Sequence, residues 1–221
     1  MPDAKPWNET EKLSREKKVL GFYVSGHPLS KYELEVDAFA TARFGAASAV
    51  KNGHPVRVCG IISSVKKKID KRGNAMAFIT LEDFSGKGEC IVFSKTYEKF
   101  VHTLQPEAMV MVMGKADVNG DTMKVLADEI YPMDSVRQKF TKSIVLSVNV
   151  NEVRDNTIVA LRGILEKHRG NCHCYFDVVE PQKERPSRLH TMKFGVNASD
   201  EFLAEVKKLL GPNAIRISQN T

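Results

Sequence analysis

The chain has 221 residues, of which 42% are hydrophobic and 27% charged, a balance typical of a globular protein with one large or two small domains. Its 33 lysines and arginines outnumber its 27 aspartates and glutamates, giving a formal net charge of +6 that favours polyanionic partners without requiring one. No apolar run approaches the roughly 20 residues of a membrane span. The first residues lack the apolar core of a signal peptide, so we expect a cytoplasmic protein with no membrane partner.

Two short helices are expected at the start of the chain. The first covers residues 9–21 and the second residues 30–39. In the second, Ser30 is the expected N-cap and Glu33, three residues later, completes a capping box. Small residues then predict a connector, so residues 1–54 form a helical lead-in and connector.

Five extended segments follow, separated by turn signals such as Gly73-Asn74 and Asn119-Gly120-Asp121. They cover residues 56–65, 75–81, 89–93, 109–118 and 122–131. A short helix is expected between the third and fourth segments, at residues 95–104. This order is typical of an OB-fold, a five-stranded barrel whose face and loops bind oligonucleotides, and we assign residues 55–135 to it as a domain for single-stranded nucleic acid.

The last part of the chain, residues 142–221, predicts a small α+β domain with the order strand-helix-strand-strand-helix-strand. The strands are expected at residues 144–150, 172–179, 189–196 and 215–217. One helix begins near Asn151 or Asp155, with Ile158, Leu161, Ile164 and Leu165 on one face. The second is capped by Ser199 and covers residues 200–210. The expected fold class is therefore mixed α and β: a five-stranded OB-fold barrel preceded by short helices and followed by a small α+β domain.

The strongest local signal is a run of basic residues at the first hairpin. Five of the seven residues from 66 to 72 are Lys or Arg. Lys66 and Lys68 lie on one side of a strand, opposite Val65 and Ile69. The charges of such a run repel one another, which favours a position near phosphates. Alternatively, the run is a solvated hairpin that keeps an edge strand from aggregating. The predicted nucleic-acid-binding residues are Lys66, Lys67, Lys68, Lys71, Arg72, Asn74, Phe78 and Phe93.

Phe78 and Phe93 are included because bases stack on aromatic side chains. Phe78 faces outward if Ile79 and Leu81 are core, and Phe93 alternates with Val92 in the same way. Either ring could instead pack under a loop or against a neighbouring domain. An aromatic content of 8% favours a weak, sequence-tolerant binder.

No catalytic constellation, cofactor or metal site is predicted. Asp83 lies where a turn favours aspartate, and there is no glycine-rich phosphate loop. We interpret His27 as a turn residue, and Cys59 and Cys90 as buried thiols.

Cys172-His173-Cys174, with His168 and His190 nearby in sequence, suggests zinc at first sight. The two cysteines lack the usual spacer, however, and a strand would place them on one face with His173 on the other. We therefore favour a plain strand.

Two further stretches carry a specific resemblance. Residues 16–29 read Glu-Lys-Lys-Val-Leu-Gly-Phe-Tyr-Val-Ser-Gly-His-Pro-Leu, and residues 71–74 and 78–83 are followed by Gly86, Glu89 and Val92-Phe93. In order and spacing the chain resembles, over nearly its whole length, the C-terminal region of the bacterial replicative DNA polymerase III alpha subunits, which are C-family DNA polymerases.

The resemblance implies a non-catalytic piece of a DNA-directed DNA polymerase, a nucleotidyltransferase active in DNA replication. The family's palm aspartates, its histidinol-phosphatase-like domain and its sliding-clamp peptide would lie outside this piece. The resemblance also implies that the basic hairpin, with Lys66, Lys68, Lys71 and Arg72, contacts single-stranded template. It further implies that residues 142–221 dock the clamp-loader tau subunit, among other holoenzyme components of the replisome.

Two alternatives from other functional classes stay open. The barrel could be an OB-fold RNA- or tRNA-binding module, or a protein-docking OB domain. The helices before the barrel and the α+β domain after it favour the polymerase hypothesis.

Overall fold

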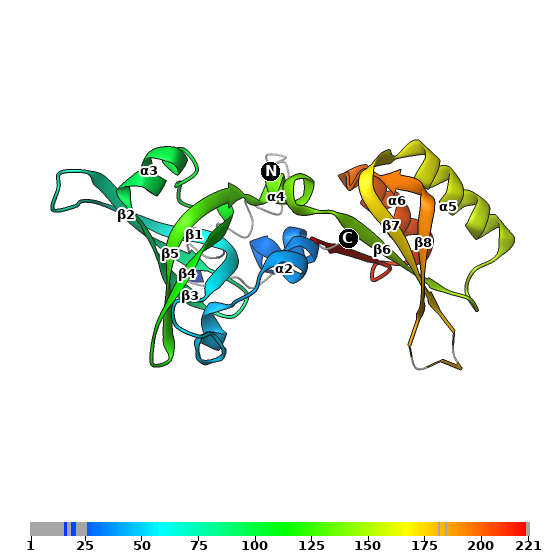
Figure 1. The fold of residues 1–221 in the computed structure, drawn as a ribbon, viewed down its shortest axis with the longest axis horizontal. Coiled ribbons are helices and arrows are strands. Elements are labelled where there is room, and N and C mark those ends of the chain that lie inside the picture. The colour runs from blue at the N-terminus through cyan, green and yellow to red at the C-terminus, as the bar shows by residue number, and fades with distance from the viewer. Residues whose placement is uncertain (1–15, 17–18, 21–25, 181, 184, 220–221) are drawn as a thin grey trace, which may run out of the picture. The chain divides into compact units, whose positions relative to one another are not determined.

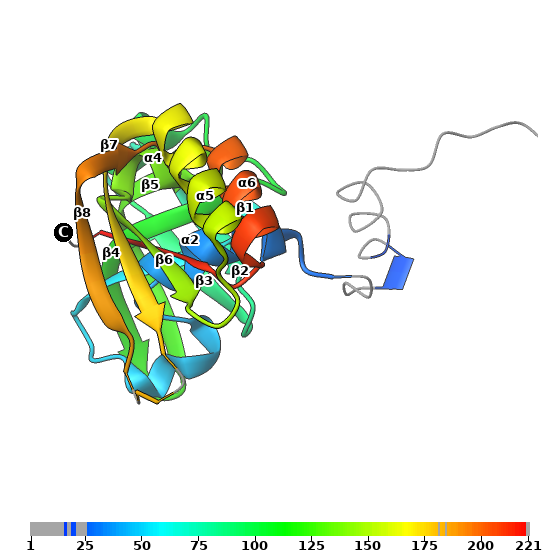
Figure 2. The same cartoon turned by 90° about the vertical axis from the view of Figure 1, so that its right-hand side faces the viewer.

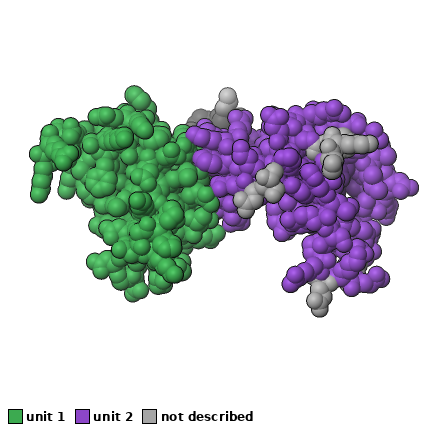
Figure 3. Space-filling view, in the orientation of Figure 1, with its two compact units in different colours: residues 1–33, 40–133 green, residues 34–39, 134–221 purple. Residues whose placement is uncertain are grey.

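The computed structural model describes residues 16, 19–20, 26–180, 182–183 and 185–219. Its contacts divide the chain into two compact units, shown in Figure 3. The barrel unit comprises Met1–Glu33 and Ala40–Met133, and the C-terminal unit comprises Leu34–Phe39 and Asp134–Thr221. The helix expected at residues 9–21 lies almost entirely outside the described residues. Among the helices of the described residues, none is long and apolar enough to cross a membrane.

The barrel unit is built on five strands that close into a barrel in the order β1-β2-β3-β5-β4 (Figure 1). The strands are β1 (Pro55–Ile69), β2 (Ala75–Glu82), β3 (Lys87–Val92), β4 (Met109–Asn119) and β5 (Thr122–Pro132). Neighbours are antiparallel except β3 and β5, whose parallel pairing closes the barrel. This is the expected OB-fold.

Alternation of side chains along β2 explains how the barrel fills. Ala77, Ile79 and Leu81 are fully buried, whereas Phe78 and Thr80 between them are only partly covered. The same period-2 pattern on the other strands gives a single core of aliphatic side chains.

One strand, β1, pairs with two different neighbours. Its first half, Pro55–Ile61, is in register with β4, and its second half, Ile61–Ile69, with β2. At the crossing lies Gly60, where a Cβ atom would stand 2.6 Å from Cγ of Leu81. A register shift between Ile62 and Ser64 adds the bend that barrel closure needs.

The segment expected as a connector instead contains η2, a 3-10 helix at Phe44–Ala49, whose Phe44 is buried in the barrel core. The carboxylate of Asp83 accepts the backbone N–H of Phe44 at 2.8 Å, as well as those of Ser85 at 2.7 Å and Gly86 at 2.9 Å. The turn role expected for Asp83 is confirmed, and this side chain also anchors η2.

The helix expected between the third and fourth strands is present as α3 (Ser94–Phe100), shorter at its end than predicted. Tyr97 is buried against the core, and the Phe100 ring meets Tyr131 edge-on with 6.2 Å between centroids.

The helix expected at residues 30–39 begins differently. It is a 3-10 turn, η1 (Pro28–Tyr32), that continues into α2 (Glu33–Phe39). The cap is His27, whose Nδ1 accepts the N–H of Leu29 at 3.2 Å, so the expectation that Ser30 caps the helix is wrong. Pro28 favours a helix start at this point because its fixed φ suits the first turn. His27 is thus a turn residue, as expected.

The C-terminal unit contains a four-stranded sheet in the order β8-β7-β6-β9, with β6 and β7 parallel and the other pairs antiparallel. Its elements are α2, α4 (Met133–Phe140), β6 (Ser143–Asn149), α5 (Asp155–Lys167), β7 (Arg169–Val179), β8 (Ser187–Val196), α6 (Asp200–Leu210) and β9 (Ile215–Ser218). Figure 2 shows α5 and α6 together on one side of the sheet.

The core of this unit lies between the sheet and those two helices. Ile144, Leu146, Cys174, Ile215 and Ile217 are buried on the sheet side. On α5, Leu161 and Leu165 of the expected apolar face are buried, whereas Ile158 of the same face is exposed. Ser199 caps α6 as expected, accepting the N–H of Phe202 at 3.2 Å.

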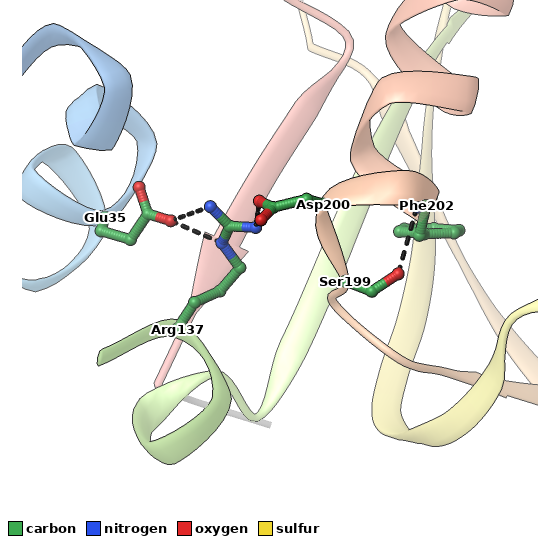
Figure 4. A network of polar contacts seen from close by, with 5 residues as sticks. All are labelled: Glu35, Arg137, Ser199, Asp200 and Phe202. Carbon is green, nitrogen blue, oxygen red and sulfur yellow. Dashed lines mark hydrogen bonds and ion pairs between the residues drawn. The ribbon is translucent and has the colours of Figure 1, made fainter. Parts of the chain in front are cut away.

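A guanidinium ties together three helices of this unit (Figure 4). Arg137 on α4 donates from Nε and Nη2 to the carboxylate of Glu35 on α2, and from Nη1 to Asp200 at the start of α6. Glu35 is only 1% exposed. The sequence predicts no helix at residues 133–140, because they contain few apolar positions.

We expect Arg137→Met to destabilise the C-terminal unit by about 3–5 kcal/mol, because it leaves the buried Glu35 carboxylate without a cation. Arg162→Met is the matched control, since Arg162 forms an exposed pair with Glu166 four residues later and should cost about 0.5 kcal/mol or less. Urea denaturation followed by circular dichroism measures both. Equal costs for the two variants would contradict the role assigned to Arg137.

Candidate nucleic-acid interface

Most of the predicted binding residues lie on the β1–β2 hairpin, where the two strands extend beyond the barrel core. Lys66 pairs with Phe78, Lys67 with Ala77, and Lys68 with Met76. The residues Lys66 to Ile69 are all exposed, because this end of β1 lies beyond the buried part of the strand. Within the described residues, no ion pair involves Lys66, Lys67 or Lys71.

Lys66, Lys68 and Phe78 share one face of the hairpin, since directly paired residues of antiparallel strands project to the same side. The Nζ atom of Lys68 lies 5.0 Å from the centroid of the Phe78 ring. Phe78 is on the outer face of the barrel, as expected, because Ile79 and Leu81 are core. An aromatic ring is thus flanked by cations, the combination that single-stranded nucleic acid requires.

Strand β3 extends this face with Ile91, which pairs with Phe78. Phe93 was expected in the same strand, but β3 ends at Val92 and Phe93 is the residue before the first turn of α3. Phe93 as a residue is 50% exposed. Phe93 therefore remains available to a ligand, at the margin of the face rather than within it.

The turn of the hairpin is organised by Asp70. Its Oδ1 accepts the backbone N–H groups of Arg72 and Asn74, each at 2.8 Å, and the Asn74 side chain donates to its Oδ2 at 3.3 Å. The N–H of Asn74 is the main reason that the pKa of Asp70 lies below its ordinary value. The side chain of Asn74 thus helps to build the turn, while Lys71 and Arg72 remain exposed.

On the same outer face, at the end of β2 and β3 away from the hairpin, acidic side chains are paired with lysines. Glu82 pairs with Lys87 at 3.5 Å, and Glu89 pairs with Lys124 of β5 at 2.9 Å. The hydrogen bond to Glu89 raises the pKa of Lys124. Sequence reasoning missed Lys124, which lies outside the basic run, and Asp70, which is the acidic residue inside it, because both act through cross-strand or turn contacts. The positive charge of the face is concentrated at the hairpin.

The Cys172-His173-Cys174 stretch lies in the strand β7, as expected. Cys174 is buried, and burial raises its pKa to about 11, while His173 projects to the opposite face. Burial likewise raises the pKa of Cys90 in the barrel. Within the described ranges, no group of three or more His, Cys, Asp or Glu side chains is placed to hold a metal ion.

We expect the Asp70 hydrogen bonds to persist above pH 4 and to be lost as the pH falls through the lowered pKa of its carboxyl. A folded-state pKa below the unfolded value means that ionised Asp70 stabilises the turn, so protonation removes that contribution. A pH titration of the Arg72 and Asn74 amide signals by ¹⁵N NMR measures the midpoint. The Asp70→Asn variant should show no such transition, and a midpoint above about pH 4 would contradict the assignment.

Comparison with known families agrees with this geometry. Residues 56–133 match a family model described as an OB-fold nucleic acid binding domain. The match covers the five barrel strands and ends at the start of α4.

The chain is also similar to curated bacterial proteins. It is 26% identical to the DNA polymerase III subunit alpha of Escherichia coli over 96% of its length, 27% to that of Vibrio cholerae over 97%, and 29% to that of Neisseria meningitidis over 98%. It spans only 18% to 19% of the length of these relatives. Among solved structures, the chain is similar to Rim1, a mitochondrial single-stranded DNA binding protein from yeast, with 16% identity and a TM-score of 0.31. The alignment covers 37% of this chain and 95% of Rim1, and a TM-score this low supports no conclusion.

The resemblance seen in the sequence motifs is therefore confirmed: over 96% to 98% of its length the chain is similar to bacterial DNA polymerase III alpha subunits, and its residues 56–133 match an OB-fold family.

Proposed function

We propose that this chain is the C-terminal part of a replicative DNA polymerase alpha subunit, and that its barrel holds single-stranded template DNA. One observation carries the proposal. Exposed lysines that form no ion pair with any described residue flank the Phe78 ring on the β2–β3 side of an OB barrel, the face on which this fold binds oligonucleotides.

The proposed mechanism is electrostatic. Lys66, Lys68, Lys71 and Arg72 neutralise template phosphates, and Phe78 stacks on a base. Each phosphate contact on a single strand contributes about −0.7 to the slope of log affinity against log salt, so four contacts give about −3. Sequence preference is not expected, because phosphate contacts carry no base information. Weak binding suits a polymerase through which the template must slide.

The remaining functions are proposed from the relatives alone. Nucleotidyl transfer belongs to the rest of the parent polymerase, and this piece requires no cofactor. The C-terminal unit tethers the polymerase to the replisome through the clamp-loader tau subunit or another holoenzyme component, in the cytoplasm.

Fluorescence anisotropy of a labelled 20-nucleotide single strand tests the hairpin. The variant with Lys66, Lys68, Lys71 and Arg72 changed to Ala should lose most binding and most of the salt slope of about −3. The matched control changes four exposed cations of the C-terminal unit, so that the net charge falls equally. These are Arg162, Lys183, Lys207 and Lys208.

Equal losses in the two variants would indicate net charge rather than a site, and would refute the hairpin proposal. An RNA strand of the same sequence runs in parallel, since the 2′-hydroxyl separates the RNA-binding alternative. Wild-type protein that is folded but binds neither strand at low salt would favour the protein-docking alternative.

Phe78 tests base stacking separately from phosphate contact. We expect Phe78→Leu to weaken binding about 5-fold to 150-fold, the equivalent of one stacked base, while the salt slope stays unchanged. Phe93→Leu should cost less, because its ring lies at the margin of the face. Anisotropy titrations at three salt concentrations give both quantities, and a changed slope with unchanged affinity would argue against stacking.

A further inference from the structure

The sheet of the C-terminal unit has a second face, opposite α5 and α6. Side chains alternate along each strand, so the residues that neighbour the buried Ile144, Cys174 and Ile217 project to this other side. It carries His173, Tyr175, Asp177, Arg188, His190 and Arg216.

Asp177 organises the cations of this face. Its side chain is 2% exposed and accepts Nε of Arg188 at 2.7 Å, Nη2 of Arg188 at 2.9 Å, and Nη2 of Arg216. The hydrogen bond from Arg188 lowers the pKa of this carboxyl. Arg188 and Arg216 are themselves 57% and 63% exposed. A covered carboxylate on β7 thus fixes two guanidinium groups at the surface, one from the neighbouring β8 and one from β9, which lies beyond β6.

Aromatic rings lie beside these cations. Tyr175 and His190 stack with 4.6 Å between ring centroids and 22° between planes, and His173 lies 5.7 Å from His190. Val145, the aliphatic side chain that pairs with both Tyr175 and Arg216, is only 7% exposed. The accessible chemistry here is therefore planar rings and guanidinium groups rather than an apolar anchor.

We propose that this face binds single-stranded nucleic acid, with the rings of Tyr175 and His190 as a platform for bases and the guanidinium groups of Arg188 and Arg216 on phosphates. Arginine recognises phosphate through a planar fork of N–H donors, and the Asp177 hydrogen bonds restrict both side chains before any ligand arrives. Aromatic stacking beside a cationic track is how sequence-tolerant single-strand sites work.

The alternative occupant is an acidic protein segment, which the same charge would attract. A tight protein interface, however, centres on an anchor that fills a desolvated pocket. On this face the central aliphatic side chain, Val145, is already covered, and Tyr175 and His190 stack on each other rather than enclosing a pocket. The observations therefore favour nucleic acid. The inference does not depend on the role proposed for the barrel, because it rests on different residues in the other unit.

The test uses the full chain and a variant that lacks the stacked pair of rings, Tyr175→Thr with His190→Thr. Threonine keeps the strand propensity of both positions and removes the stacking surface. Leu189→Thr is the matched control, because Leu189 is exposed on the same strand but projects to the opposite face. Each change is made alone and together with the four Ala substitutions of the basic hairpin.

We expect residual single-strand binding in the hairpin variant at low salt, reduced at least about 5-fold by the two Thr substitutions and unchanged by Leu189→Thr. Ultraviolet cross-linking to a bromodeoxyuridine strand should label the peptide that contains Tyr175 or His190. If the hairpin substitutions have no effect while the Thr substitutions remove binding, this inference stands and the barrel proposal fails.

Three results would overturn the inference. The first is a folded hairpin variant with no residual binding, and the second is residual binding that the Thr substitutions leave intact. The third is binding of polyglutamate, dependent on Tyr175 and His190, with no binding of the labelled strand. That result would indicate an acidic protein partner for this face.

Discussion

The barrel unit depends on one strand that serves two neighbours. β1 pairs with β4 up to Ile61 and with β2 from there to Ile69, and Gly60 permits the close approach of Leu81 at the crossing. At about 3.3 Å per residue, a strand this long outruns the core that it helps to enclose. Residues 66–69 at the end of β1 therefore lie beyond the barrel interior and are exposed on both faces of the strand. Cations can occupy these positions without being buried, which is why the lysine run can sit in a regular strand.

The charges on the outer face are arranged unevenly. Glu82 and Glu89 each have a cross-strand lysine, so that end contributes little net potential, whereas the lysines of the hairpin have no acidic partner among the described residues. Exposed ion pairs add little stability, so the pairing matters more for the field of the face than for folding. Positive charge confined to the hairpin attracts a polyanion, while the neutral remainder of the face adds little electrostatic affinity.

The sequence predicted what alternation and turn chemistry determine. The five barrel strands, the helix after β3 and the cap at Ser199 follow from period-2 patterns and local hydrogen bonds. The errors arose where tertiary contacts decide. His27 rather than Ser30 caps the helix expected at residues 30–39, and Ile158 on α5 is exposed although Leu161 and Leu165 are buried. The basic hairpin was visible as a charge run, but Asp70 could be recognised as its organiser only from the turn geometry.

The C-terminal unit is discontinuous in sequence, and this explains why its limits could not be read from composition. α2 precedes the barrel by more than a dozen residues, yet its Glu35 is buried against Arg137 of α4, and Phe39 meets Phe140 with 6.3 Å between ring centroids. Arg137 also holds Asp200, so one guanidinium joins segments from three parts of the chain. Burial of a carboxylate is strongly destabilising unless a cation pairs with it, so the packing of α2 depends on α4. A fragment that begins at residue 142 would lack both, although pattern and spacing alone place the domain start there.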